Sequence, residues 1–68
     1  MAFDVLVVYM DPVKTEIQSE TIQAETIQAA KGVVNEYYYN NIYGLGYSIK
    51  SSDGLTLDRG GIISEDSN

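Results

Sequence analysis

One amphipathic segment in the middle of the chain constrains the fold most. Apolar residues recur there at spacings of three and four, as on one face of an α-helix: Ile27, Ala30, Val33, Val34 and Tyr37. Thr26 precedes them, and its hydroxyl can accept a hydrogen bond from a free amide of the first turn. The sequence therefore predicts one helix over residues 27–39, which needs another element to cover its apolar face.

Three residues refine this helix. Gly32 lies inside it, where glycine costs up to about 1 kcal/mol relative to alanine, so we expect a close approach of the helix to the sheet there. Asn40 and Asn41 follow it and are typical left-handed stop residues.

Residues 3–10 are rich in β-branched and aromatic side chains. Asp4 is the one charge, so only one of the two alternating faces is polar. This pattern predicts a strand interior to the sheet and covered largely on both faces. Asp11 and Pro12 end it, because proline cannot donate to a strand ladder.

The segment 13–24 gives conflicting signals. Ile17, Ile22 and Ile27 recur every five residues, which fits neither the helical period nor the strand period. Two interpretations stay open: a short strand over residues 21–24, or a helix that begins as early as Val13.

The second half of the chain predicts strands. Bulky residues alternate with small ones, which gives one full face and one bare face that another backbone can approach: Tyr43, Leu45, Tyr47 and Ile49 against Gly44, Gly46 and Ser48. Residues 51–54 are a hairpin turn signal, with residues 55–57 as the returning strand. Residues 59–61 predict another turn before a short strand at residues 62–63, and residues 64–68 a frayed acidic tail.

Together these elements predict an α+β fold. We expect one amphipathic helix packed on an antiparallel sheet of three to five strands, in a single compact domain over residues 1–63.

Composition argues against catalysis and against direct nucleic-acid binding. The chain of 68 residues has no His, Cys or Trp, which removes the usual proton shuttle, the thiolate nucleophile and the soft metal ligands. Four basic residues against ten acidic ones give a net charge of -6, too little positive charge to bind a phosphate backbone. We expect a non-enzymatic protein with no metal and no cofactor.

Two short motifs resemble ligand-binding sequences, but each is more typical of an ordinary strand or turn. Gly44-Leu45-Gly46 lacks the third glycine of a dinucleotide fingerprint and falls inside a strand. Asp53-Gly54 is only a fragment of a calcium loop and is more typical of a tight turn.

The beginning of the chain predicts a cytoplasmic protein without membrane contact, in the host cytoplasm if the source is viral. Residues 1–4 carry an acid instead of a basic leader region, and the apolar run over residues 5–10 is too short to span a bilayer.

Tyrosines are the most informative cluster. Adjacent helical residues point in different directions, so Tyr38 and Tyr39 cannot both enter a core that also takes Tyr37, and at least one of them should be exposed. Tyrosine is enriched at interface hot spots, although these rings can equally cap the edge of a small core. We expect Tyr38, Tyr39 and Tyr43 to bind a partner.

Two carboxylates extend the predicted interface. Glu25 and Glu36 lie eleven residues apart, which places them near one helix face and gives the expected surface its acidic character. Two interpretations of these carboxylates stay open. They can be simple solvated charges, or they can mimic phosphates locally at a basic groove of a partner.

The order of these elements resembles a known class of proteins. A strand running into residues 22–26, a helix carrying Ala29, Ala30 and Lys31, and the hairpin over residues 53–57 are similar to small phage anti-CRISPR proteins of the type I class. The resemblance implies a non-enzymatic inhibitor that occupies a host protein or ribonucleoprotein surveillance complex and blocks nucleic-acid access. Because this chain is acidic, lysine contacts to nucleic acid do not carry over.

A second function class stays open. The chain would then be a self-associating structural module, such as a small virion or scaffold component, in which the tyrosine face pairs with its own copy as a homodimer.

Overall fold

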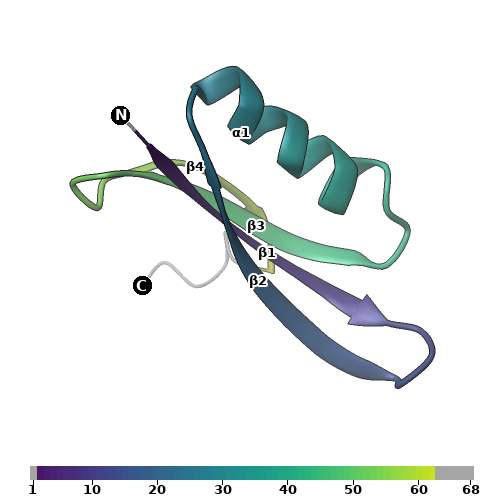
Figure 1. Ribbon diagram of the computed structural model, residues 1–68. Helices are drawn as coiled ribbons and strands as arrows, with labels where there is room; N and C mark the ends of the chain where they lie inside the picture. The colour runs from purple at the N-terminus through teal and green to yellow at the C-terminus, as the bar shows by residue number, and fades with distance from the viewer. Residues whose placement is uncertain (1, 63–68) are drawn as a thin grey trace.

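In the computed structural model, residues 2–62 are described and form one antiparallel sheet with a helix on one face (Figure 1). The four strands lie in the order β2-β1-β3-β4. The elements in chain order are β1 (Phe3–Asp11), β2 (Glu16–Ala24), α1 (Ile27–Val34), the π-helical turn η1 (Asn35–Tyr39), β3 (Gly44–Ser51) and β4 (Thr56–Gly61). The predicted α+β class is confirmed, while the expected tail at 64–68 lies outside the described residues.

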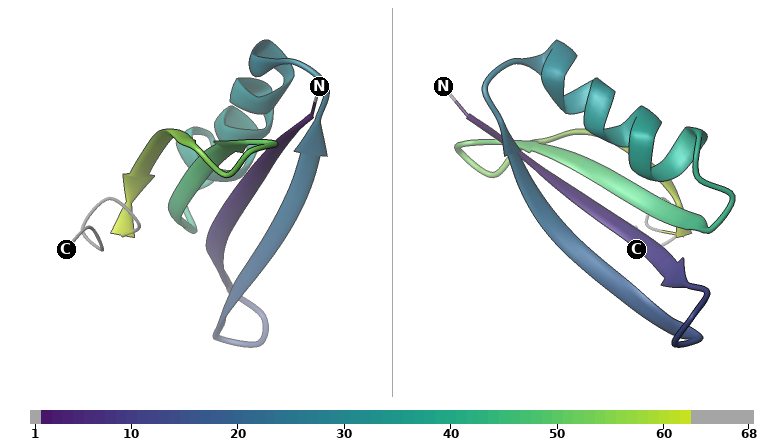
Figure 2. Two further views of the ribbon diagram at one scale, coloured as in Figure 1. Left: turned by 90° about the vertical axis from the view of Figure 1, so that its left-hand side faces the viewer. Right: turned by 45° about the vertical axis from the view of Figure 1, so that its right-hand side comes forward.

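Strand β1 is interior to the sheet, as predicted, and pairs with β2 on one side and β3 on the other. Its alternation places Val5 and Val7 on the face under α1. The core lies between this face and the helix, and its buried apolar members come from both layers: Val5, Val7, Ala24, Ala30, Val34, Tyr47 and Ile49. Figure 2 shows the helix along this one face of the twisted sheet.

The opposite face of β1 is not covered as the sequence suggested. Leu6, Val8 and Met10 alternate with the core residues and are only half-buried. On that face Ile62 approaches the backbone of Gly46 on β3. The expectation of cover on both faces was wrong because the one helix covers a single face of the sheet.

Strand β2 resolves the ambiguous segment. It begins at Glu16, so the predicted strand at 21–24 was too short and the alternative helix from Val13 was wrong. Ile17 and Ile22 lie five apart and therefore on opposite faces of this strand, whereas Ile27 belongs to the helix. The spacing of five residues therefore covers both faces of β2 and the start of the helix, and it does not indicate one regular element.

The helix begins where predicted. The Thr26 hydroxyl accepts a hydrogen bond from the amide of Ala29 at 3.0 Å. Gly32 is exposed, and a Cβ there would meet nothing within 4 Å, so the expected close approach at this residue was wrong. The helix ends through η1, in which the Asn40 amide donates to the Asn35 carbonyl at 2.7 Å. Asn40 has φ -98, so the chain stops without a left-handed residue.

The close approach occurs at Gly44 on β3 instead. A Cβ there would lie 2.7 Å from the Tyr37 carbonyl oxygen of η1, so only glycine fits between the sheet and the end of the helix. The predicted turn over residues 51–54 is confirmed, with Gly54 at φ 86. The expected turn at 59–61 was wrong, because β4 continues through Gly61.

Candidate functional site

Five tyrosines gather where the end of the helix meets β1 and β3. Tyr38 lies between two other rings, with its centroid 4.9 Å from that of Tyr39 and 5.1 Å from that of Tyr47. Tyr9 and Tyr37 make a further tilted pair at 6.0 Å. The π-helical turn η1 presents three consecutive tyrosines, so its geometry decides which ring reaches the core and which stays in water.

A chain of hydrogen bonds joins the helix end to β4. The Tyr39 and Tyr47 hydroxyls lie 3.3 Å apart, and the Tyr47 hydroxyl donates to Oδ2 of Asp58 at 3.2 Å. The hydrogen bond with Tyr39, burial and the negative charge of Asp58 all raise the pKa of Tyr47 far above its ordinary value. Tyr47 is therefore a neutral phenol at neutral pH, which makes it a hydrogen-bond donor and a poor base.

Gly60 makes room for this chain. It pairs with Tyr47 across β3 and β4, and a Cβ at Gly60 would lie 2.5 Å from Cε1 of the Tyr47 ring. The ring lies over the glycine, which directs its hydroxyl toward Asp58.

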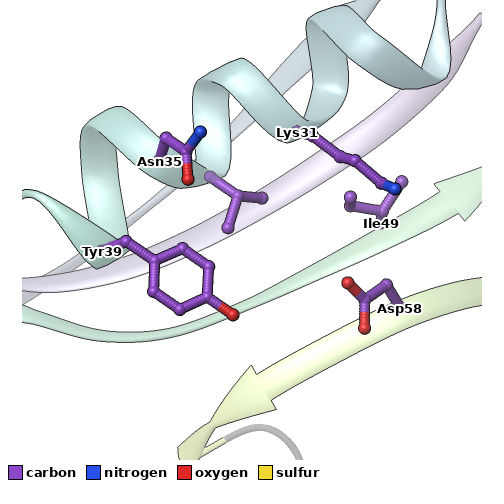
Figure 3. A pocket seen from close by; sticks show the side chains of 6 residues that line it. Lys31, Asn35, Tyr39, Ile49 and Asp58 are labelled. Carbon is purple, nitrogen blue, oxygen red and sulfur yellow. The ribbon is translucent and has the colours of Figure 1, made fainter.

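A pocket opens beside these tyrosines, between α1 and the strands β3 and β4. It measures about 230 Å³, and both layers contribute to its lining: Lys31, Val34, Asn35, Tyr39, Ile49 and Asp58. Figure 3 shows Lys31 on the helix and Asp58 on β4 with Ile49 between them. Small-molecule sites usually enclose about 300–1,000 Å³, so this pocket suits one inserted side chain better than a whole ligand.

The surface next to the pocket is aromatic and apolar. Tyr39 is 64% exposed, Ile42 is 90% exposed and Tyr43 is 42% exposed. With half-buried Tyr38, these residues form what we call the tyrosine patch: Tyr38, Tyr39, Ile42 and Tyr43. Tyr39 belongs to the patch and also lines the pocket, so the two features share this residue.

The structure brings together four of the five predicted partner-binding residues. Tyr38, Tyr39 and Glu36 lie in η1, and Tyr43 follows in the turn before β3. Glu25 precedes the helix cap, at the other end of α1. The shared helix face expected for Glu25 and Glu36 was wrong, because the first lies before the helix and the second lies in a turn of different period.

Sequence reasoning missed Lys31 and Asp58 as parts of this surface. Nothing in the sequence links a residue of the helix to a charge on the last strand, because their proximity depends on strand order. Gly60 was the available signal, since glycine within a strand often marks the close approach of another group.

Other kinds of site are not seen in the part of the chain that the structure describes. No three His, Cys, Asp or Glu residues among residues 2–62 converge as a metal site. Within the same range, no helix has the length and apolarity needed to cross a bilayer. Comparisons with protein-family models, curated proteins and solved structures find no match to this chain.

Proposed function

We propose that this chain is a non-enzymatic inhibitor of phage type that docks on a host protein or a nucleic-acid-handling complex. The observation that carries the proposal is the tyrosine patch, where Tyr39, Ile42 and Tyr43 are exposed within one short segment beside a pocket. Large apolar side chains gathered on a surface are typical of protein interfaces.

The geometry of the pocket supports a protein partner. Hot-spot side chains commonly fill small desolvated pockets, with less important contacts around them that exclude water. Here Tyr39 forms one wall, and Lys31 and Asp58 offer a donor and an acceptor on facing walls. A partner side chain inserted there can meet both charges while its neighbours cover the patch.

The chemistry of the site supports binding over catalysis. A phenol that acts as a general base needs a pKa lowered toward neutrality, whereas the surroundings of Tyr47 raise its pKa and make it unsuited to that role. Glu36, in the same turn as Tyr38 and Tyr39, and the net charge of -6 favour a basic partner surface, such as one that otherwise receives nucleic acid.

The test uses a purified type I surveillance complex and its target duplex. We expect the chain to reduce duplex binding, and the double variant Tyr39→Ala, Tyr43→Ala to inhibit about 100-fold less well because two hot-spot rings are lost. Leu55→Ala is the matched control, because Leu55 is also exposed but lies in the turn at the far end of β3. Equal inhibition by all variants, or none by the unaltered chain at low salt, contradicts the proposal.

A second candidate function, self-association as a structural module, is favoured by the open face of the sheet. Leu6, Val8 and Met10 form an apolar row there, and Ile17 beside Met10 is 64% exposed. Sedimentation velocity over a concentration series tests this. A module should dimerise, and Val8→Lys should return it to a monomer, whereas a monomer at every concentration excludes this function.

A further inference from the structure

The outer edge of β2 is a complete strand edge. β2 pairs with β1 in an uninterrupted register from Phe3↔Ala24 to Asp11↔Glu16. It is the terminal strand of the sheet, and within residues 2–62 no other segment pairs with its second side (Figure 2). Such an edge is a template for another extended chain.

The groups that face outward follow from one hydrogen bond. The Met10 amide of β1 donates to the Tyr43 carbonyl at 2.9 Å, on the side away from β2. Backbone groups alternate in an antiparallel strand, so the odd-numbered residues of β1 face β2, and their partners on β2 are even-numbered. The amides and carbonyls that point outward are therefore those of the odd-numbered residues: Ile17, Ser19, Thr21 and Gln23.

Apart from its two carboxylates, β2 lacks the usual protections of an edge. The strand has no proline, no lysine or arginine, and no register shift against β1. None of the four residues with outward backbone groups is charged. Its two carboxylates, Glu16 and Glu20, share the helix-side face, where Glu20 accepts a hydrogen bond from the Tyr9 hydroxyl at 2.7 Å.

These carboxylates specify the charge of an incoming strand. Residues opposite Glu16 and Glu20 on an antiparallel strand would occupy the non-hydrogen-bonded pairs, in which facing side chains come closest. Opposite charges stabilise such pairs and like charges destabilise them. A second copy of β2 would offer no basic residue in return, because the strand has none.

We propose that the β2 edge binds an extended segment of a partner protein by antiparallel strand addition, with Lys or Arg at the two positions that face Glu20 and Glu16. This surface is separate from the tyrosine patch, so the inference goes beyond the proposed function and does not rest on it. The two basic residues are four positions apart, and apolar residues at the positions facing Ile22 and Ile17 complete the pattern.

The probe is a synthetic peptide with this pattern, acetyl-Val-Thr-Lys-Thr-Thr-Val-Lys-amide, titrated into the isotope-labelled full chain. We expect saturable changes in amide chemical shifts along β2, with slower hydrogen exchange at Ile17, Ser19, Thr21 and Gln23. The same peptide with Glu in place of both Lys should bind at least about tenfold more weakly, because two cross-strand ion pairs become repulsive.

Two variants test the mechanism. Thr21→Pro removes an outward amide and should abolish peptide binding. The double variant Glu16→Lys, Glu20→Lys should reverse the preference between the two peptides, which keeps the test valid if the proline variant does not fold. Tyr39→Ala with Tyr43→Ala should leave peptide binding unchanged, which separates this surface from the tyrosine patch.

Three results would overturn the proposal. One is the absence of shift changes at peptide concentrations up to about 1 mM, the weakest affinity expected of a specific site. Another is equal binding of the Lys and Glu peptides, and a third is protection of the β2 edge amides by rising protein concentration alone, with no competition from the peptide. The last result would assign the edge to a second copy of the chain.

Discussion

The two edges of the sheet differ in how far they invite another strand. The β2 edge is a regular strand of nine residues that is tied to the rest of the molecule mainly through its ladder with β1. The β4 edge has six residues, a register shift near its start and two glycines at its end, of which Gly61 has φ 67. A bulged, short and glycine-terminated edge resists strand addition, whereas a long straight edge accepts it.

The difference teaches that, within residues 2–62, this small sheet protects one edge and leaves the other available. At β4, the Tyr47 hydroxyl binds Asp58 and the Tyr47 ring lies over Gly60, so side chains fix the strand to the core. At β2, side chains also bind the sheet, because Glu20 accepts a hydrogen bond from Tyr9, Gln23 donates one to Asp4 and Ala24 is buried in the core. Irregular backbone therefore marks the closed edge, and regular backbone marks the open one.

The largest expected effect tests which β2 amides are already paired. Glu20→Pro should lower the free energy of unfolding by about 3 kcal/mol, because it removes a ladder hydrogen bond to β1 and leaves a carbonyl unpaired. Thr21→Pro at an outward amide should cost less than about 1 kcal/mol. Urea denaturation monitored by circular dichroism measures both, and equal losses would contradict the assigned direction of the amides.

The next effect tests the closed edge. Gly61→Ala should destabilise the fold by about 2 kcal/mol, because alanine is strained at positive φ and its Cβ would meet the backbone of Leu45 and Gly46. Gly54→Ala is the matched control, since Gly54 also has positive φ but open space around it. Chemical denaturation should give the larger loss for Gly61, and the reverse order would show that β4 is not closed by its glycines.

A smaller effect concerns the anchor of β4. Tyr47→Phe should lower the free energy of unfolding by about 1 kcal/mol at neutral pH, the usual worth of one hydrogen bond. Folding raises the pKa of Tyr47 above its ordinary value of 10.0, so its contribution is complete below pH 10 and is lost as pH rises beyond that value. Denaturation at a series of alkaline pH values should show a steeper fall for the unaltered chain than for the variant, and parallel curves would contradict the role of this hydroxyl.

The smallest effect tests whether the helix influences the β2 edge. Gly32→Ala should raise the free energy of unfolding by about 0.4–1 kcal/mol, since the residue is helical, is exposed and has room for a Cβ. The midpoint of thermal unfolding measures the gain. Peptide binding at the β2 edge should not change, and a loss of binding would show that the helix and that edge are coupled.

Local signals in the sequence predicted the elements well where one pattern dominated. The spacing of three and four after Thr26 predicted α1, the apolar run predicted β1 as an interior strand, and Asp53-Gly54 predicted the last turn. The sequence patterns failed at glycines, because a glycine can mark a turn, a close contact or an ordinary position in a helix or strand. Gly32 was read as a contact point although it is a solvent-facing helical residue, and the glycines after Arg59 were read as a turn although they lie in a strand.

The candidate site was also predicted only in part. Three adjacent tyrosines cannot share one core, so the sequence predicted that at least one of Tyr38 and Tyr39 is exposed, and the structure shows Tyr39 to be that residue. The pocket between Lys31 and Asp58 did not follow, because these residues are far apart in the chain and meet only across two layers. The separation of Glu25 from the patch could have been predicted, because the helix begins at Ile27 as the sequence indicated.

By itself, the sequence determined the class of fold, the capped helix, the interior strand and the absence of histidine and cysteine, because each depends on residue type or on short-range periodicity. Only the tertiary structure decided which sheet edge is open within residues 2–62, which face of β1 the helix covers and which tyrosine meets Asp58. Those features depend on strand order and on the direction of backbone groups, and both are set by pairing between segments that are distant in the chain.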